Sequence, residues 1–508
     1  MNAEAIPLAE DLKTDLLTGT IRANIANPER SANFDLQAAV DDVLKDVGMS
    51  RKDSGGTLDF YGRDPIIPSA LRFGSVAAIG LASKAIAVAA LWKLRSGEGQ
   101  DIAVDVRKAL RRFCGFFELK WETMNGRPPN FLDPLNPFLG PHLFRETRDG
   151  RHIVAVNIYP KLAARALKLL RCDASEESVS EAILQWRGLD LEDAAAEAGL
   201  PMAMVRTFDE FRSEPQYTDV LSRMPLITVE RIGDSEPRPF EANGKSPLDG
   251  IRALGMGHVI AGAAIGRDLA LYGADVLNVW RPGDSEIESF IWDAQVGMRS
   301  TIVGYSQEDR AKLDQLLNDA DVFFSNKRPG YLERNGLDAE TLCERKPGLV
   351  HVRVLAHGDK GPWKNRPGFD ETGAAVAGLF SIEGSPTKPS SPPVIPIVDN
   401  VVAWLGTTGT LAALRRRAVE GGSYRVTVCL TRTVLWLLSL GIFDKDYSRA
   451  TAGSSDEHDY VAPDIITAET PLGTYQGITD QTFMSKTPGS FRTVLVPRGS
   501  SKPEWLAR

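Results

Sequence analysis

The regular alternation of short apolar runs and amphipathic segments between residues 250 and 356 most constrains the fold of this chain. Each apolar run has the length of a buried strand, and the segments between the runs have the composition of helices. Because this order is typical of crossover-connected βα units, it predicts a parallel sheet with helices on both faces. The expected strands are 250–256, 274–280, 321–326 and 349–356, and the expected helices are 261–273, 307–320 and 331–336.

The first βα turn, LGMGHVIAGAAIG, is rich in glycine and invites comparison with a dinucleotide-binding turn. Gly255, Gly257 and Gly262 do not have the G-x-G-x-x-G spacing. The next strand ends at Trp280 without the acidic residue that holds an adenosine ribose. NAD and FAD are therefore not expected, and the turn is predicted to bring backbone amides close to another phosphate or acyl group.

The chain also contains an internal repeat. AALWKLRSGEGQDIAVDV, residues 89–106, and AALRRRAVEGGSYRVTV, residues 412–428, both read as an apolar helix, a basic end, a glycine pair and an alternating strand. The two helices differ near their starts, where the first has Ser75, Val76 and Ala77 and the second has Asp399. Two copies of one structural unit are predicted.

Asp399 is the one carboxylate in the otherwise apolar stretch from Pro392 to Leu414. Burying a carboxylate without a partner is costly and shifts its pKa. Three interpretations are open from the residues alone: a helix N-cap, a core acid paired with an arginine, or a catalytic group. A polar residue in the first copy, Ser75, is compatible with the capping interpretation.

Composition narrows the class of protein. A chain of 508 residues predicts two or more lobes, and a net charge of −8 gives no whole-chain basis for binding nucleic acid or an anionic membrane. Cys114, Cys172, Cys343 and Cys429 are scattered without metal-type spacing, which favours reduced thiols, a cytoplasmic location and no metal site. No signal peptide or uninterrupted membrane-spanning run is seen.

Five segments, taken in order, make the chain similar to the class III CoA-transferase family, which includes formyl-CoA transferase, carnitine CoA-transferase and alpha-methylacyl-CoA racemase. The segments are 247–284, 298–303, 320–363, 365–384 and the helix headed by Asp399. The resemblance implies an α/β fold, with a Rossmann-like parallel-sheet large domain and a smaller α+β domain. It also implies the interlocked arrangement of family dimers, in which one subunit's small domain closes on the other subunit's large domain.

The order of the segments differs from a typical member. The chain resembles a first copy that lost its catalytic half, fused to a second copy that lost its small domain. We therefore expect one complete active site per chain, in a monomer that is a fused pseudo-dimer or in a homodimer. The expected divisions are an N-terminal extension (1–65), the first-copy helix and strand joining the large domain (66–130), the small domain (131–243), a linker (244–250), the catalytic CoA-binding large domain (251–445) and a C-terminal return segment (446–508).

In the family's transferases, the residue matched by Asp399 is the nucleophile that forms an anhydride and then an aspartyl-CoA thioester. If Asp399 begins a helix, the helix dipole is expected to stabilise its ionised form. The racemase branch carries a histidine where this chain has Phe369, and phenylalanine cannot transfer protons. Isomerase or lyase chemistry on an acyl-CoA, and a non-catalytic acyl-CoA-binding role, stay open as alternatives.

Coenzyme A, as acyl-CoA, and a carboxylic acid are the substrates that the resemblance implies. CoA needs an apolar slot for its adenine and pantetheine, and arginine or lysine for its phosphates. Ile260 stands where several transferases carry a polar residue, which favours a larger or more apolar acyl group. His258 and His357 are expected to be structural. The residues that the resemblance points to for CoA are Val259, Ala261, Arg281, Arg299, Asn326, Lys327, Arg334 and Phe369.

Overall fold

The predicted βα alternation forms a seven-stranded sheet in the computed structural model of the chain, which describes residues 8–113, 115–130, 136–138 and 143–507. Neighbouring strands are parallel except for the last pair, β13 and β7, so the expected α/β fold with a parallel sheet is confirmed. The sheet order is β10 (Arg299–Ile302), β9 (Asp275–Trp280), β8 (Arg252–Met256), β11 (Val322–Ser325), β12 (Val350–Leu355), β13 (Ser423–Cys429) and β7 (Thr228–Gly233).

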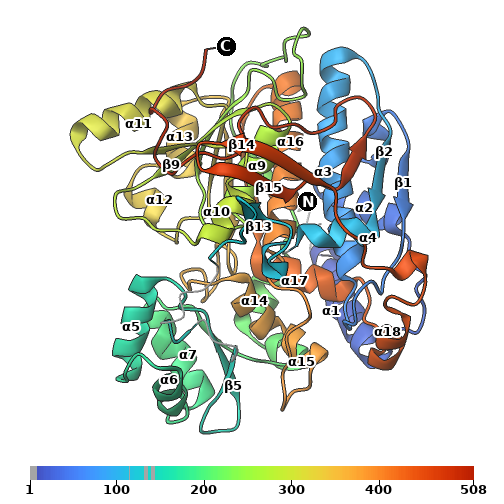
Figure 1. Cartoon of the computed structure of the whole chain (residues 1–508), viewed down its shortest axis with the longest axis vertical. Helices are drawn as coiled ribbons and strands as arrows, with labels where there is room; N and C mark the ends of the chain where they lie inside the picture. The colour runs from blue at the N-terminus through green and yellow to red at the C-terminus, as the bar shows by residue number, and fades with distance from the viewer. Residues whose placement is uncertain (1–7, 114, 131–135, 139–142, 508) are drawn as a thin grey trace, which may run out of the picture.

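Helices cover both faces of this sheet, as Figure 1 shows. Successive strand residues point to opposite faces, so each strand supplies two apolar clusters. Val322 and Phe324 belong to the main core, while Leu254 and Phe323 belong to a second cluster on the other face. The covering helices are α9 (Ala263–Leu271), α11 (Gln307–Asp319), α13 (Ala339–Arg345) and α16 (Asp399–Glu420).

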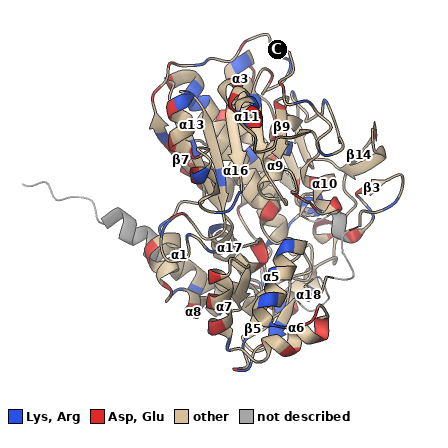
Figure 2. Ribbon diagram, turned by 90° about the vertical axis from the view of Figure 1, so that its left-hand side faces the viewer, with Lys and Arg blue, Asp and Glu red and all other residues tan. Residues whose placement is uncertain are grey.

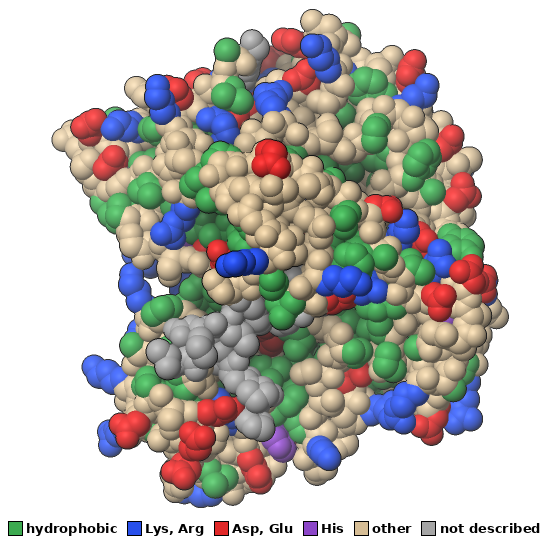
Figure 3. Space-filling model, viewed as in Figure 1, with side chains coloured by type: hydrophobic (Ala, Val, Ile, Leu, Met, Phe, Trp, Pro, Cys, Tyr) green, Lys and Arg blue, Asp and Glu red, His purple; other side chains and the backbone are tan. Residues whose placement is uncertain are grey.

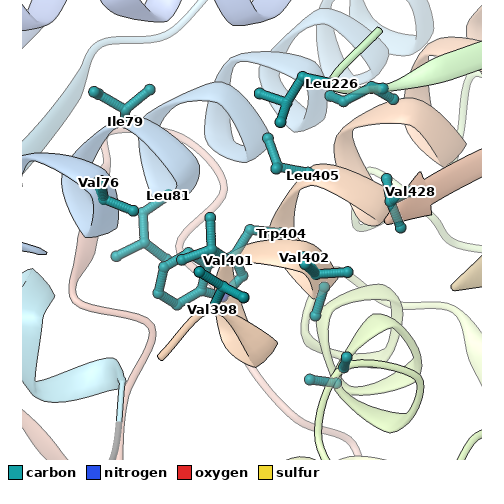
Figure 4. Close-up of a cluster of buried hydrophobic side chains, with 14 of the residues drawn as sticks. Val76, Ile79, Leu81, Leu226, Val398, Val401, Val402, Trp404, Leu405 and Val428 are labelled. Carbon is teal, nitrogen blue, oxygen red and sulfur yellow. The ribbon is translucent and has the colours of Figure 1, made fainter. Parts of the chain in front are cut away.

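The two repeat helices, α3 (Phe73–Ser96) and α16, pack against each other in the main core. Figure 4 shows Val76 and Leu81 of α3 beside Val401 and Trp404 of α16. The most apolar window of α3 is long enough to cross a membrane, yet all of it is buried inside the protein. α3 is therefore a core helix in this structure.

The strand that follows α3 does not extend the large sheet. β2 (Ile102–Asp105) forms where alternation predicts a strand, but it pairs with β1 (Leu58–Tyr61) and β16 (Thr482–Met484) in a separate three-stranded sheet. The second-copy strand β13 does join the large sheet. The two segments of the predicted repeat thus both form a long core helix followed by a strand, and they differ in the sheet to which the strand belongs.

The smaller α+β unit lies at the lower left of Figure 1. Its antiparallel sheet is β4 (Phe144–Glu146), β5 (His152–Ala155) and β6 (Met202–Met204), covered by α5 (Pro160–Leu170), α6 (Glu176–Ile183) and α7 (Gly188–Glu197). Within the range expected for the small domain, 131–243, one strand, β7, pairs with β13 at the edge of the large sheet. Cys114, residues 131–135 and residues 139–142 lie outside the described residues.

The chain ends add further elements around the core. A third small sheet joins β14 (Ile465–Thr470) and β15 (Gly473–Ile478) to β3 (Thr123–Met124). Basic and acidic residues are interspersed along the ribbon in Figure 2. The remaining α-helices are α1 (Leu8–Ala26), α2 (Leu36–Asp46), α4 (Val106–Ala109), α8 (Phe208–Phe211), α10 (Glu288–Ala294), α12 (Tyr331–Arg334), α14 (Asp370–Ala377), α15 (Leu379–Glu383), α17 (Leu430–Ser439) and α18 (Lys445–Thr451).

Candidate active site

A cavity of about 410 Å³ lies where the carboxyl ends of β8, β11 and β12 meet the small α+β unit. The loops after these strands supply most of its wall, which is the usual position for a ligand in an open α/β sheet. Tyr159, Pro160, Lys161, Leu162 and Pro201 supply the opposite wall from the small unit. A single chain therefore contributes both walls. On the face shown in Figure 3, acidic and basic side chains are intermixed over the surface.

Six of the nine residues selected from the sequence line this cavity, and three do not. The six are Asp399, Val259, Ala261, Asn326, Lys327 and Phe369. The three that lie elsewhere are Arg281, Arg299 and Arg334.

Those three arginines lie outside the cavity lining. The buried Arg281 donates hydrogen bonds to the carbonyl oxygens of Val303 and Gly304 at 3.1 and 2.7 Å. Arg299 forms a two-point ion pair with Asp275, at 2.9 and 3.0 Å, on the large sheet. Arg334 is an exposed residue of the short helix α12. In this structure Arg281 and Arg299 are held by the protein's own acceptors.

Asp399 is the first residue of α16, but it does not cap that helix. The cap is the carboxylate of Asp370, which accepts hydrogen bonds from the backbone N–H groups of residues 397–399, the last two at 2.9 and 3.3 Å. Within the described part of the chain, the Asp399 carboxylate receives no hydrogen bond or ion pair, although the residue is only 7% exposed. Of the three interpretations, capping and arginine pairing are therefore not observed.

The protonation of Asp399 differs from the expectation. Burial, followed by the negative charge of Asp370, raises the pKa of the Asp399 carboxyl well above 3.8. The neighbouring Glu371 also has its pKa raised well above the usual value, by burial and then by Asp370. The prediction that the helix dipole stabilises ionised Asp399 is wrong in net effect, because desolvation and a nearby like charge outweigh it.

The turn after β8 is held residue by residue by side chains from other segments. Asn278 Oδ1 accepts from the Gly257 N–H at 3.0 Å, and Asn326 Oδ1 accepts from the His258 N–H at 2.9 Å. Val259 follows with φ of +56°, a left-handed conformation that is strained for a β-branched residue. The turn therefore has its shape imposed by surrounding groups.

Basic side chains gather at one side of the cavity. The Lys327 Nζ lies 2.6 Å from His258 Nε2 and 3.2 Å from Asp284 Oδ2. Burial lowers the pKa of Lys327. The pKa of Asp284 is lowered by the adjacent His258 and Lys327. Lys161 and Lys364 line the cavity as exposed residues without an ion pair among the described residues. This side of the site is suited to anionic groups of a ligand.

Both histidines near the site have structural partners. His357 Nδ1 lies 2.9 Å from the hydroxyl of Thr431, and burial lowers its pKa to about 4. His258 packs edge-on against Trp280, with ring centroids 4.7 Å apart. No group of three or more metal-ligating side chains is found among the residues that the structure describes.

The comparisons with known proteins place the large-sheet segment in a family. A family model described as CoA-transferase family III matches residues 248–476. This segment belongs to CoA-transferase family III.

Two curated relatives show how far this likeness extends. Succinyl-CoA--L-malate CoA-transferase alpha subunit of Chloroflexus aurantiacus is 30% identical over 48% of this chain and 59% of its own length. Acetyl-coenzyme A transferase nodX of Hypoxylon pulicicidum is 32% identical over 40% of this chain and 35% of its own length. A crystal structure of Rv3272 from Mycobacterium tuberculosis is 31% identical over 38% of this chain and 58% of that chain, with a TM-score of 0.35. The chain thus spans only part of the length of the CoA-transferases that it matches.

Proposed function

We propose that this protein transfers coenzyme A from an acyl-CoA to a carboxylic acid, with Asp399 as the nucleophile. The observation that carries the proposal is a cavity-lining carboxylate that neither caps its helix nor pairs with a cation among the described residues. Asp370 supplies the cap instead. An acid kept in a buried position without a structural role is a candidate for chemistry.

The proposed reaction takes four steps. The ionised Asp399 attacks the thioester carbonyl, forming a mixed anhydride and releasing the CoA thiolate. The thiolate attacks the Asp399 carbonyl, giving an aspartyl-CoA thioester and the free donor acid. The acceptor carboxylate attacks this thioester, forming a second mixed anhydride and releasing the CoA thiolate. The thiolate then attacks the acceptor carbonyl of this anhydride, which gives the new acyl-CoA and releases the Asp399 carboxylate. Covalent capture divides one difficult exchange into easier steps.

The lining of the cavity is compatible with an acyl-CoA substrate. Val259, Ala261, Leu430 and Phe369 provide apolar surface, which suits the acyl group and the pantetheine arm. Lys161, Lys327 and Lys364 are the residues we propose for contacts with the CoA phosphates. Ile260 is buried and does not line the cavity, but its neighbours Val259 and Ala261 do and are apolar, so we propose an acyl group larger or more apolar than oxalyl.

We further propose that one chain makes one complete site. The cavity wall combines residues 159–162 with residues of the large sheet from the same chain. A single chain is then expected to bind one CoA and to be active as a monomer. Titration of CoA into the monomer isolated by size exclusion measures this, and activity that appears only in a dimer fraction contradicts it.

The nucleophile is tested by trapping. The protein is mixed with a panel of acyl-CoA thioesters and hydroxylamine, and the peptide that contains Asp399 is examined by mass spectrometry. A hydroxamate at Asp399 is expected, and it must be absent in the Asp399→Asn variant. A chain that binds acyl-CoA without forming a hydroxamate with any thioester contradicts the proposal and favours a binding protein or a family relative with other chemistry. Phe369 in place of a histidine disfavours racemisation.

A further inference from the structure

We propose that Tyr159 and Glu286 are positioning residues that make the shape of the turn at Val259 depend on docking of the small α+β unit. The proposal rests on the proposed function, because the turn it controls lines the cavity that holds Asp399. Tyr159 comes from the small unit and Glu286 from the loop between β9 and α10. Neither residue belongs to the set predicted from the sequence.

Glu286 controls the strained residue of the turn. Its side chain is completely buried, and its Oε2 accepts a hydrogen bond from the Val259 N–H at 2.7 Å. Val259 has a left-handed backbone, which a β-branched residue adopts only where its surroundings impose it. The buried carboxylate is the group that receives the Val259 amide, so it stabilises the strained conformation directly.

Tyr159 connects the same carboxylate to the small unit. It is the residue before α5, and its hydroxyl donates a hydrogen bond to Glu286 Oε1. Its ring stacks on Phe369, with centroids 6.3 Å apart and planes inclined by 13°. Burial and the negative charges of Glu286 and Asp399 raise the pKa of Tyr159 well above 10. The phenol therefore stays protonated and remains a donor to Glu286.

The two hydrogen bonds connect the small unit to the turn through Glu286. The small unit holds Tyr159, Tyr159 holds one oxygen of Glu286, and the other oxygen holds the Val259 amide. When the small unit moves away, Glu286 Oε1 loses the Tyr159 hydroxyl and keeps the Ile287 N–H at 3.0 Å as its donor, so the carboxylate is held less firmly. We infer that the turn then relaxes, so that a site with an undocked small unit is not productive.

The test uses Tyr159→Phe, which removes the hydroxyl and keeps the ring that stacks on Phe369. The matched control is Tyr272→Phe, because the Tyr272 hydroxyl also donates to a carboxylate, Asp480, at 3.1 Å, and Tyr272 does not line the cavity. Tyr159→Phe is expected to lower kcat about 10- to 100-fold, the range expected for one lost hydrogen bond to a charged group. The KM for acyl-CoA is expected to change much less, and the control to retain full activity.

A second readout does not depend on turnover. Hydrogen exchange at the amides of residues 257–262 is expected to be faster in Tyr159→Phe than in the control. In Glu286→Gln the amide oxygen can still accept from the Val259 N–H, but the NH2 group replaces an oxygen that also accepts the Ile287 N–H at 3.0 Å, so exchange between that of the wild type and that of Tyr159→Phe is expected. Glu286→Ala removes both contacts and is expected to show fast exchange.

The outcomes separate the two proposals. Unchanged exchange and unchanged kcat in Tyr159→Phe overturn the positioning role, even in an active transferase. Faster exchange in a chain that transfers no CoA with any thioester keeps the coupling and contradicts the proposed function. An equal loss of activity in Tyr272→Phe means that the effect is general destabilisation, which also overturns the positioning role.

Discussion

The starts of the two repeat helices, α3 and α16, are both capped by a carboxylate, but only the start of α16 lines the cavity. At α16, the Asp370 carboxylate accepts backbone N–H groups from residues 397–399. At α3, the Asp64 carboxylate accepts the Gly74 and Ser75 N–H groups at 3.1 and 2.6 Å. In both cases the capping acid comes from outside the helix, so capping alone does not explain a second acid at α16.

The two helix starts also differ in their surroundings. The residue before α3, Arg72, is completely buried and pairs with Glu29, and Val76 and Ala77 are also buried. Asp399, in contrast, lines the cavity. The start of α3 is thus buried in the core, whereas the start of α16 carries an acid that faces the cavity.

The largest expected effect comes from replacing Asp399, the acid that has no counterpart at the start of α3. Asp399→Asn is expected to reduce CoA transfer by at least about 1,000-fold, because removing a covalent nucleophile leaves only binding and orientation. The measurement is steady-state turnover with the thioester that gives the strongest trapping.

The counterpart in the first copy is the matched control for this change. Ser75→Ala, at the start of α3, is expected to leave turnover unchanged, since Ser75 does not line the cavity. CoA binding by the Asp399→Asn variant, measured by calorimetry, is expected to persist. A variant without Asp399 that turns over at the wild-type rate contradicts the assignment.

The two capping acids give the second comparison. Asp370→Asn and Asp64→Asn each replace a charged cap by a neutral one and are expected to destabilise the fold by about 1–3 kcal/mol. Only Asp370→Asn is expected to lower kcat as well, because it displaces the helix start that carries Asp399. Denaturant unfolding and turnover, measured on both variants, test this. Equal losses of activity in the two would show that the two helix starts are not functionally different.

Much of the large domain was predictable because its signal is local. The strands at 250–256, 274–280, 321–326 and 349–356 each have enough consecutive apolar residues to be recognised. The edge strand β7 mixes half-buried and exposed residues and carries no such pattern. Its place beside β13 depends on contacts between distant segments, which composition and periodicity do not record.

The site was predictable in part for a similar reason. Asp399 stood out because a charge interrupts an apolar run. Glu286 lies in the acidic segment GDSEIES, which resembles an ordinary solvated loop, and its partner Tyr159 is 127 residues away in the chain. The capping role of Asp370 likewise depends on a contact across 29 residues. Such roles arise from tertiary contacts, and a single sequence does not indicate them.

The close contact between the two helices provides a smaller test. A Cβ added at Gly80 of α3 would lie 2.8 Å from the Trp404 ring of α16, so Gly80→Ala must displace that ring. A cost of about 1–3 kcal/mol in unfolding free energy is expected from overpacking. Because Trp404 and Asp399 belong to the same helix, α16, kcat is also expected to fall by severalfold, although Gly80 lies on α3, whose start does not line the cavity.

Gly19→Ala is the control for this change, since a Cβ at Gly19 of α1 meets nothing within 4 Å. It is expected to be neutral or slightly stabilising in a helix. An equal loss of stability in the two variants would contradict the packing explanation.

The smallest expected effect is a pH-dependent gain in the thermal stability of Asp399→Asn over the wild type. Asp399 has a raised pKa in the folded chain, so the folded state keeps a proton that the unfolded chain releases near pH 3.8. Its contribution to stability is therefore present below that pH and is lost as the pH rises through the folded-state pKa. Asp399→Asn cannot ionise, and its Tm is expected to exceed that of the wild type increasingly from about pH 4 to the raised pKa, where the difference levels off. Thermal unfolding of both proteins across this range measures the difference. Ser75→Ala in α3 is expected to show no such pH dependence, and a constant difference between Asp399→Asn and wild type would mean that Asp399 is not desolvated in the folded chain.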